Sequence, residues 1–327
     1  MPSEHQLSNS LPPAILLMGP TACGKTGLAL ELARRFPLEI ISVDSALVYR
    51  GMDIGTAKPS LSVLNEVPHH LIDILDPTES YSAASFREDA LRLMREITEV
   101  NRIPLLVGGT FLYFKALESG LSKLPPADQM VRNRIKQEAE MRGWEAMYRE
   151  LVCLDPAASK RIHPNDPQRV QRALEVIRLT GKPLSSLQSG EQNPLPYRLL
   201  RIGLIPHNRE LLHRQIQCRF EKMLTKGLIN EVTDLYQRGD LNLSLPSMRA
   251  VGYRQVWHYL TGEWDRQTMI EKAIVATRQL AKRQMTWLRA DSNIMMRVNA
   301  DEIDLSKVSV QVAQFIEGDD LLPSAIL

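Results

Sequence analysis

One eight-residue stretch near the start of the chain restricts its fold more than any other feature. It reads Gly19, Pro20, Thr21, Ala22, Cys23, Gly24, Lys25, Thr26 and fits the pattern G-x-x-x-x-G-K-[ST]. An apolar run from Ala14 to Met18 precedes it, and a helical pattern follows it as far as Pro37. A strand, a glycine-rich loop and a helix in this order surround an anion with backbone N–H groups and a lysine. The stretch therefore predicts a diphosphate or triphosphate site, with the Thr26 hydroxyl as a ligand of Mg²⁺.

Further buried strands alternate with helices after this loop. Apolar runs predict strands over Glu39–Val43, His70–Leu75 and Ile103–Val107, and a helical pattern fills Ser82–Val100. Such alternation is typical of a parallel sheet with helices on both faces. The predicted fold is an α/β, doubly wound parallel sheet of the P-loop NTPase type.

Strand signals are lost over Asp128–Thr180, where the pattern is helical between two polar connectors. We expect an inserted all-helical domain at 123–197, between a first core segment at 1–122 and a second, mostly helical one at 198–327. Within the second segment the sequence predicts a strand and three helical stretches, followed by a stretch without a readable motif. These predicted elements are Arg198–Ile205, Arg209–Arg238, Tyr253–Leu260 and Gln267–Arg289.

The charge of the chain is uneven. The formal net charge is only +2, yet the segment from Lys123 to Ile205 contains 14 Lys/Arg and 9 Asp/Glu. The segment from Met248 to Arg289 contains 8 Lys/Arg and 3 Asp/Glu. Two basic segments can serve an anionic partner even when the overall charge is small. Cys23, Cys153 and Cys218 have no paired spacing, which argues against disulfides and a zinc site. No apolar run reaches the length of a membrane span, so we expect a cytoplasmic protein without membrane contact.

Two polar segments follow predicted strands and come to the same edge of the sheet. Asp44 follows the Glu39–Val43 strand and is read either as a general base or as a solvated turn residue. Thr110 follows Gly108 and Gly109 after another strand, and it can contact a substrate, cap a helix, or do both.

Seven motifs spread over most of the chain resemble those of the bacterial tRNA dimethylallyltransferases, also called tRNA isopentenyltransferases. They are GPTACGKT, DSALVYRGMDIGTAKP, YSAASFREDA, PLLVGGTFLYFKAL, HPNDPQRVQRALEV, VGYRQ and RQLAKRQMTWLR, in family order from Gly19 to Arg289. The resemblance implies transfer of a dimethylallyl group from dimethylallyl diphosphate to the exocyclic amine of the adenine at tRNA position 37, beside the anticodon. It also implies that this adenine is flipped into a channel, and that the enzyme is a monomer.

The resemblance also assigns roles to residues. Asp44 takes the proton from the amine, while Thr21 and Arg219 hold the diphosphate with Lys25 and Mg²⁺; taken alone, Arg219 would be a surface arginine beside core Phe220. The tRNA contacts implied are Asp44, Ser45, Ala46, Leu47, Thr110, Gln168, Arg169, Val170, Gln171, Arg172, Arg249, Ala250, Val251, Gly252, Tyr253 and Arg254. Without the resemblance, Asp166 and Pro167 simply predict a helix start and Arg169 and Arg172 a solvated basic face.

The chain departs from the common family pattern at two places and leaves two other functions open. Cys23 replaces a small residue such as serine, and Ala46-Leu47 replaces Met-Gln. We expect the Cys23 thiol, near a helix N-terminus, to be acidic, open to alkylation and protected by diphosphate.

One alternative function is that of an ATP-dependent kinase of a nucleoside or small molecule. The other is an RNA-binding module with a regulatory nucleotide site.

Overall fold

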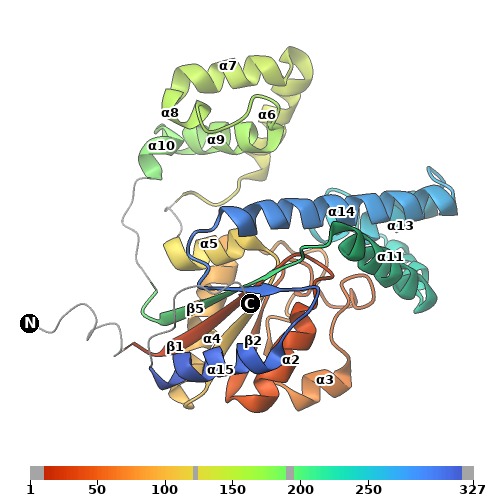
Figure 1. The fold of residues 1–327 in the computed structure, drawn as a ribbon. Helices are drawn as coiled ribbons and strands as arrows, with labels where there is room; N and C mark the ends of the chain where they lie inside the picture. Colours follow the sequence, from red (N-terminus) through yellow and green to blue (C-terminus); the bar gives the residue numbers. More distant parts are fainter. Residues whose placement is uncertain (1–10, 121–123, 189–194, 319–327) are drawn as a thin grey trace, which may run out of the picture. The chain divides into compact units, whose positions relative to one another are not determined.

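The computed structural model describes residues 11–120, 124–188 and 195–318, and the chain divides into two compact units (Figure 1). The first unit combines Met1–Glu118 with Leu195–Leu327, and the second is Ser119–Pro194. Residues 195–197, which we expected in the insertion, group with the sheet unit. The reason is that Leu195 and Tyr197 are buried in the core beside the sheet.

The first unit is built on a six-stranded sheet in the order β3-β2-β4-β1-β5-β6, with every neighbouring pair parallel. The strands are β1 (Pro13–Met18), β2 (Leu38–Val43), β3 (His69–His70), β4 (Ile103–Gly108), β5 (Arg198–Ile205) and β6 (Met296–Asn299). This architecture confirms the predicted parallel α/β sheet. The register sets Met18 and Val43 each opposite Gly108, so the loops after β1, β2 and β4 start side by side.

Two strands differ from the sequence prediction. The strand expected at His70–Leu75 is only two residues long, because Leu71 and Asp73 take left-handed backbone conformations with φ of 61° and 56°. β6 lies in the stretch for which no element was predicted. Only Met296 and Val298 of its four residues are buried, so its apolar signal is short.

Helices cover both faces of the sheet (Figure 1). Residues of β1 alternate between the faces: Leu16 packs in one core cluster, and Ile15 and Leu17 pack in the other. The cluster of Leu16 includes residues of α4 (Ala83–Glu99), α5 (Phe111–Ser119) and α14 (Arg266–Ala290). The cluster on the opposite face includes residues of α2 (Lys25–Arg35) and α15 (Leu305–Glu317). The short helix α3 (Leu61–Glu66) lies between β2 and β3 in the sequence.

A third cluster of buried residues packs helices that follow β5 against the segment after β2. These elements are α11 (Arg209–Thr225), α12 (Leu228–Gln237), the 3-10 helix η1 (Ser247–Arg249) and α13 (Tyr253–Leu260). The helical stretch predicted at Arg209–Arg238 is divided into α11 and α12. Gly227 separates them with a φ of 99°, a conformation that glycine adopts more readily than other residues. The α11 helix lies alongside α14.

In the described residues of the second unit, the regular elements are all helices, and they pack around a core of their own. Its helices are α6 (Gln129–Arg142), α7 (Trp144–Leu154), α8 (Pro156–Ser159), α9 (Pro167–Thr180) and α10 (Leu184–Leu187). As predicted, Asp166 caps α9 and Pro167 occupies its first turn; the Asp166 side chain accepts a hydrogen bond from Arg169 N. Glu175 of α9 is fully buried and forms ion pairs with Arg132 and Arg172, so its charge is compensated.

None of the helices in the described residues combines the length and the apolar character that a bilayer crossing requires.

Candidate functional site

The phosphate loop connects β1 to α2, as the sequence predicts. Gly24 precedes α2 with a φ of 91°, and Ala22 also has a positive φ, of 64°. The Lys25 ammonium donates a hydrogen bond to the carbonyl oxygen of Pro20 at 2.6 Å, which closes the loop on itself. Thr26 is exposed at the start of α2. The loop thus presents a helix N-terminus, a lysine and a hydroxyl on one side of the sheet edge.

The expectation of an acidic, accessible Cys23 is wrong. Its side chain is only 4 % exposed and packs in the core cluster that also holds Ile15 and Leu28. Burial raises the pKa of the Cys23 thiol, and the nearby charge of Lys25 offsets this effect only in part. Cys23 therefore anchors the phosphate loop to the core of the first unit.

We expect iodoacetamide to modify Cys153 and Cys218, which are exposed, and to leave Cys23 unmodified in the folded protein. The raised pKa of the Cys23 thiol keeps the fraction of reactive thiolate low, and burial keeps the reagent away from the sulfur. Peptide mapping by mass spectrometry measures the labelling at each cysteine. Labelling in denaturant is the control, and there all three cysteines should react. Rapid labelling of Cys23 in the native protein would contradict this placement.

Asp44 lies at the end of β2, next to the loop after β4. Its Oδ1 atom accepts a hydrogen bond from Ala46 N at 2.8 Å, which leaves the other carboxylate oxygen for the cavity described below. Thr110 Oγ1 accepts a hydrogen bond from Ser45 N at 3.2 Å, and Thr110 N donates to the carbonyl oxygen of Val43. Asp44 is therefore held by a turn and also faces a cavity, so the two readings of this residue are compatible.

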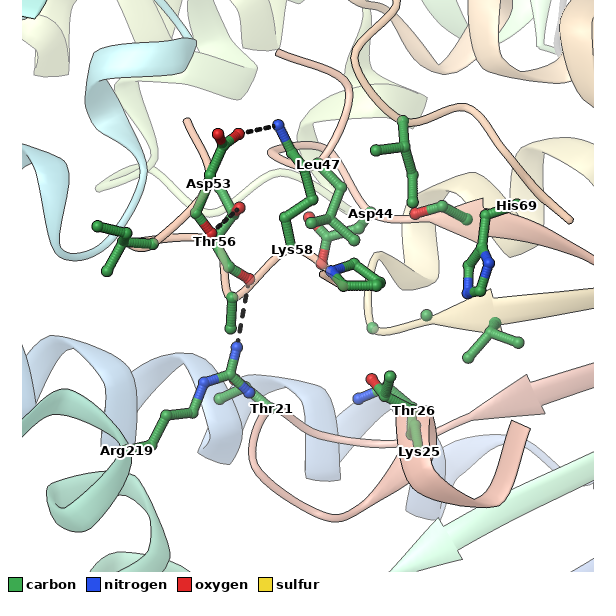
Figure 2. Close-up of a pocket in the computed structure, with 18 of the residues that line it drawn as sticks. Thr21, Lys25, Thr26, Asp44, Leu47, Asp53, Thr56, Lys58, His69 and Arg219 are labelled. Atoms are coloured by element: carbon green, nitrogen blue, oxygen red, sulfur yellow. Dashed lines mark hydrogen bonds and ion pairs between the residues drawn. The ribbon is translucent and has the colours of Figure 1, made fainter. Parts of the chain in front are cut away.

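Arg219 comes to this edge from α11. On the same helix Phe220 is in the core as predicted, together with Leu212, Ile216 and Met223. The guanidinium donates a hydrogen bond to the carbonyl oxygen of Thr56 at 3.3 Å, and Figure 2 shows it pointing to the loop that contains Thr56. Burial lowers the pKa of Arg219, while the nearby negative charge of Asp44 acts in the opposite direction. An anion bound beside Arg219 would compensate its buried charge.

The segment 51–59, which we call the roof loop, covers the cavity opposite the phosphate loop (Figure 2). Lys58, whose side chain is 4 % exposed, donates hydrogen bonds to Asp53 and Asp73. The carboxylate of Glu231 accepts hydrogen bonds from the backbone N–H groups of residues 53–55 and from the Tyr253 hydroxyl. The charged side chains of Lys58 and Glu231 thus hold the roof loop through hydrogen bonds.

Tyr253 differs from the resemblance-based expectation. Its side chain is fully buried and bonded to Glu231, and burial raises the pKa of its hydroxyl. A ring in this position cannot stack on a nucleic-acid base. It packs against Gly55 of the roof loop instead: a Cβ atom built on Gly55 would lie 2.4 Å from Tyr253 Cε2.

We expect Gly55→Ala to lower the melting temperature, because the added methyl group has no room beside Tyr253. Overpacking of this kind costs about 1–3 kcal/mol, which differential scanning calorimetry detects. Gly27→Ala is the matched control, since a Cβ atom at Gly27 meets no atom within 4 Å and alanine favours a helix. An unchanged melting temperature for Gly55→Ala would show that the roof loop does not pack tightly on Tyr253.

Two cavities meet at this edge of the sheet. The first, of about 890 Å³, is lined by Lys25, Thr26 and the roof loop, and the second, of about 520 Å³, by Ser45, Thr110 and the segment 249–252. Eight residues line both cavities: Thr21, Asp44, Thr56, Gly109, Arg219, Met223, Leu280 and Gln284. Asp44, Thr21 and Arg219, the three predicted catalytic residues, all lie in this shared wall.

Most predicted tRNA contacts of the first unit line the second cavity, namely Asp44, Ser45, Ala46, Thr110, Arg249, Ala250, Val251 and Gly252. Leu47 lines the first cavity instead. Arg254 is exposed but lines neither cavity. The structure thus brings the segments after β2, after β4 and after η1 together around one opening.

The predicted tRNA contacts of the second unit form the start of α9. Gln168 and Arg169 are exposed, whereas Val170 is fully buried in the core of this unit. The Gln171 amide donates to the carbonyl oxygen of Arg132, and Arg172 donates to Glu175. Of these five residues, only Gln168 and Arg169 are exposed.

Several residues at the junction had no predicted site role, although they lie in the motif RQLAKRQMTWLR. Gln284 lines both cavities, and Arg283 and Trp287 line the second one from the same helix, α14. A signal for Gln284 was present, since it falls on the apolar stripe of α14 with Ala281, Met285 and Leu288. A polar residue on a buried stripe has a specific partner in most proteins.

The family model described as IPP transferase matches residues 47–291 of this chain. A curated protein named tRNA dimethylallyltransferase from Thioalkalivibrio sulfidiphilus (strain HL-EbGR7) is 61 % identical over 307 residues, covering 94 % of this chain and 96 % of the relative. The tRNA dimethylallyltransferase 2 of Hahella chejuensis (strain KCTC 2396) is 55 % identical, with coverage of 93 % and 96 %.

Solved structures give the same similarity. The full-length tRNA isopentenylpyrophosphate transferase of Bacillus halodurans has a TM-score of 0.68 at 39 % identity and covers 94 % of this chain and 96 % of its own. A eukaryotic dimethylallyltransferase, described as acting on tRNA, has a TM-score of 0.79 at 26 % identity, with coverage of 95 % and 81 %.

Proposed function

Because this chain belongs to the IPP transferase family and transfers a dimethylallyl group to tRNA, we propose that dimethylallyl diphosphate is the donor. The acceptor in this proposal is the exocyclic amine of the adenine at position 37, beside the anticodon. The observation that carries the proposal is the wall shared by the two cavities, which contains Asp44, Thr21 and Arg219. Dimethylallyl diphosphate bound in the first cavity and the adenine bound in the second would meet at Asp44.

The reaction joins the amine nitrogen to the allylic carbon and breaks the bond between that carbon and the diphosphate oxygen. Asp44 accepts the proton that the amine loses, through the carboxylate oxygen that does not bond to Ala46 N. The electron pair of the broken bond leaves with the diphosphate, so the negative charge on the phosphate oxygens grows as the bond lengthens. Groups that stabilise this charge lower the barrier.

Cationic and N–H groups around the first cavity suit that leaving group. Lys25 and Arg219 line it together with the start of α2, where the helix N-terminus favours an anion. The desolvated guanidinium of Arg219 gains its counter-ion when diphosphate binds. Thr21 lies in the shared wall and can donate its hydroxyl hydrogen to a phosphate oxygen.

The residues present also fit a magnesium ion. Thr26 is exposed and lines the first cavity together with Asp44. In the described residues, no group of three or more His, Cys, Asp or Glu side chains could hold a metal. Mg²⁺ in phosphate sites keeps several waters and binds the substrate phosphates, and the hydroxyl of a phosphate-loop Ser or Thr is a common protein ligand for it, a role that Thr26 suits. When bound to Thr26 and the diphosphate, the ion would neutralise charge on the leaving group.

The second cavity suits an unstacked base. Its lining includes Arg249 and Arg283, and Trp287, which is 43 % exposed and stacked on Phe111 at a ring separation of 6.4 Å. Arginines pair with phosphates, and aromatic rings stack on bases that have left a helix. The exposed Gln168 and Arg169 of the second unit would add contacts to the same tRNA.

A phosphotransferase is the less favoured function, and the position of an isotope separates the two chemistries. Dimethylallyl diphosphate labelled in the allyl group should pass its label to unmodified tRNA, whereas donor labelled at the β-phosphorus should release all its label as diphosphate. ATP labelled at the γ-phosphorus should label neither tRNA nor a nucleoside. Phosphorus label appearing on a nucleoside or on tRNA would refute the proposed bond cleavage.

A further inference from the structure

A buried glutamine on α14 connects the phosphate loop to the loop after β4. Gln284 is 8 % exposed. Its Oε1 atom accepts a hydrogen bond from Thr21 N at 2.8 Å, and its Nε2 atom donates one to the carbonyl oxygen of Gly109 at 2.9 Å. Both halves of the amide are therefore used, each by a backbone group of a loop that lines both cavities.

The surrounding backbone is shaped around this amide. A Cβ atom built on Gly109 would lie 2.3 Å from Gln284 Nε2, so the close approach needs a glycine. Gly109 is followed by Thr110, whose hydroxyl oxygen accepts the Ser45 N–H next to Asp44. A continuous set of hydrogen bonds and peptide links thus runs from Thr21 through Gln284 to the residue beside Asp44.

We propose that Gln284 is a positioning residue, which holds Thr21 and the Asp44 edge of the sheet at the separation that dimethylallyl transfer requires. The inference rests on the proposed function, since it concerns the same reacting groups. Gln284 acts through Thr21 and Gly109 and takes no part in the bond changes. Reactions that depend on placement lose rate steeply when a group moves by an ångström.

The chemistry of the amide explains why other side chains fail here. Methionine has a similar length but offers neither a good acceptor to Thr21 N nor a donor to Gly109 O. An ionised glutamate accepts from Thr21 N but sets a negative oxygen against the Gly109 carbonyl. A protonated glutamic acid restores one acceptor and one donor, so its function should depend on pH.

Gln284→Met is expected to slow single-turnover transfer from saturating dimethylallyl diphosphate to tRNA by about 100-fold. The affinity for inorganic diphosphate with Mg²⁺, measured by calorimetry, should fall by less than about tenfold, since one indirect hydrogen bond is lost. A purely structural role would instead lower the melting temperature and leave the rate of the folded fraction close to that of the wild type.

Gln284→Glu supplies a readout that a folding defect does not produce. The ratio of its transfer rate to that of the wild type should rise as the pH falls from about 8 to about 6, because burial raises the pKa of the introduced carboxyl and favours its protonated form. Dividing by the wild-type rate removes the pH dependence that the two enzymes share. A ratio that stays constant with pH would overturn the proposal, even if the methionine variant fails to fold.

Gln279→Met on the same helix is the matched control, since Gln279 is exposed and lines neither cavity. Its transfer rate should equal that of the wild type. A Gln284→Met rate within about threefold of the control would also overturn the positioning role. A wild type that transfers no label would refute the proposed function, whereas a wild type that transfers label at the same rate as both Gln284 variants would refute only the positioning role.

Discussion

Asp44→Asn is expected to reduce the rate of dimethylallyl transfer by about 1,000-fold, within the range found when a general base is removed. Asparagine keeps the oxygen that accepts the Ala46 N–H, so the turn after β2 should stay intact. What it lacks is the capacity to take a proton from the attacking amine. Single-turnover assays with saturating donor and tRNA measure the loss, and gel-shift titration should show unchanged affinity for tRNA.

The control for this prediction is Asp234→Asn, an exposed aspartate of α12 that lines neither cavity. It should transfer at the wild-type rate. If Asp44→Asn retained more than about a tenth of the wild-type rate, a different group would have to be the base, because proton transfer by a positioned side chain contributes more than that.

Arg219→Gln should lower the transfer rate by about 100-fold, the effect of removing one donor from a site of developing negative charge. The substitution also removes the hydrogen bond to the Thr56 carbonyl, which links α11 to the roof loop. We therefore expect weaker binding of inorganic diphosphate as well, measured by calorimetry in the presence of Mg²⁺. The effect on tRNA affinity should be small.

Arg214→Gln is the matched control on the same helix, because Arg214 is exposed and lies outside both cavities. Loss of tRNA affinity in Arg219→Gln, with the diphosphate affinity preserved, would show that this arginine serves the nucleic acid and not the leaving group.

The sheet could be predicted from the sequence because its central strands carry local signals. β1, β2, β4 and β5 are rich in apolar residues and mostly buried, although β2 contains Glu39 and Ser42 and β5 contains Arg198 and Arg201. The strands that were missed or misplaced lie at the edges, where β3 has two residues and β6 has four. Short edge strands depend on pairing with a neighbour, which a local pattern does not reveal. The break between α11 and α12 was missed even though Gly227, which has a φ of 99° there, is a local signal for it.

The site was predictable only as far as its residues belong to motifs. The phosphate loop and Asp44 follow strands directly, so strand order places them at one edge. Arg219 is separated from Asp44 by many residues and was assigned only through the family resemblance. Tyr253 and Cys23 were misread, since burial is a property of the packed structure: Tyr253 is covered by the roof loop, and Cys23 by the core. Gln284 needed the three-dimensional contacts.

The most direct test is to identify the modified nucleoside. Unmodified tRNA is incubated with dimethylallyl diphosphate and Mg²⁺, digested to nucleosides and oligonucleotides, and analysed by mass spectrometry, with Asp44→Asn and an ATP incubation run beside it. We predict one dimethylallyl group on the amine of the adenine that follows the anticodon, present with the wild type and missing with the variant. Unalkylated adenine at that position, or a phosphorylated product in the ATP incubation, would contradict the account.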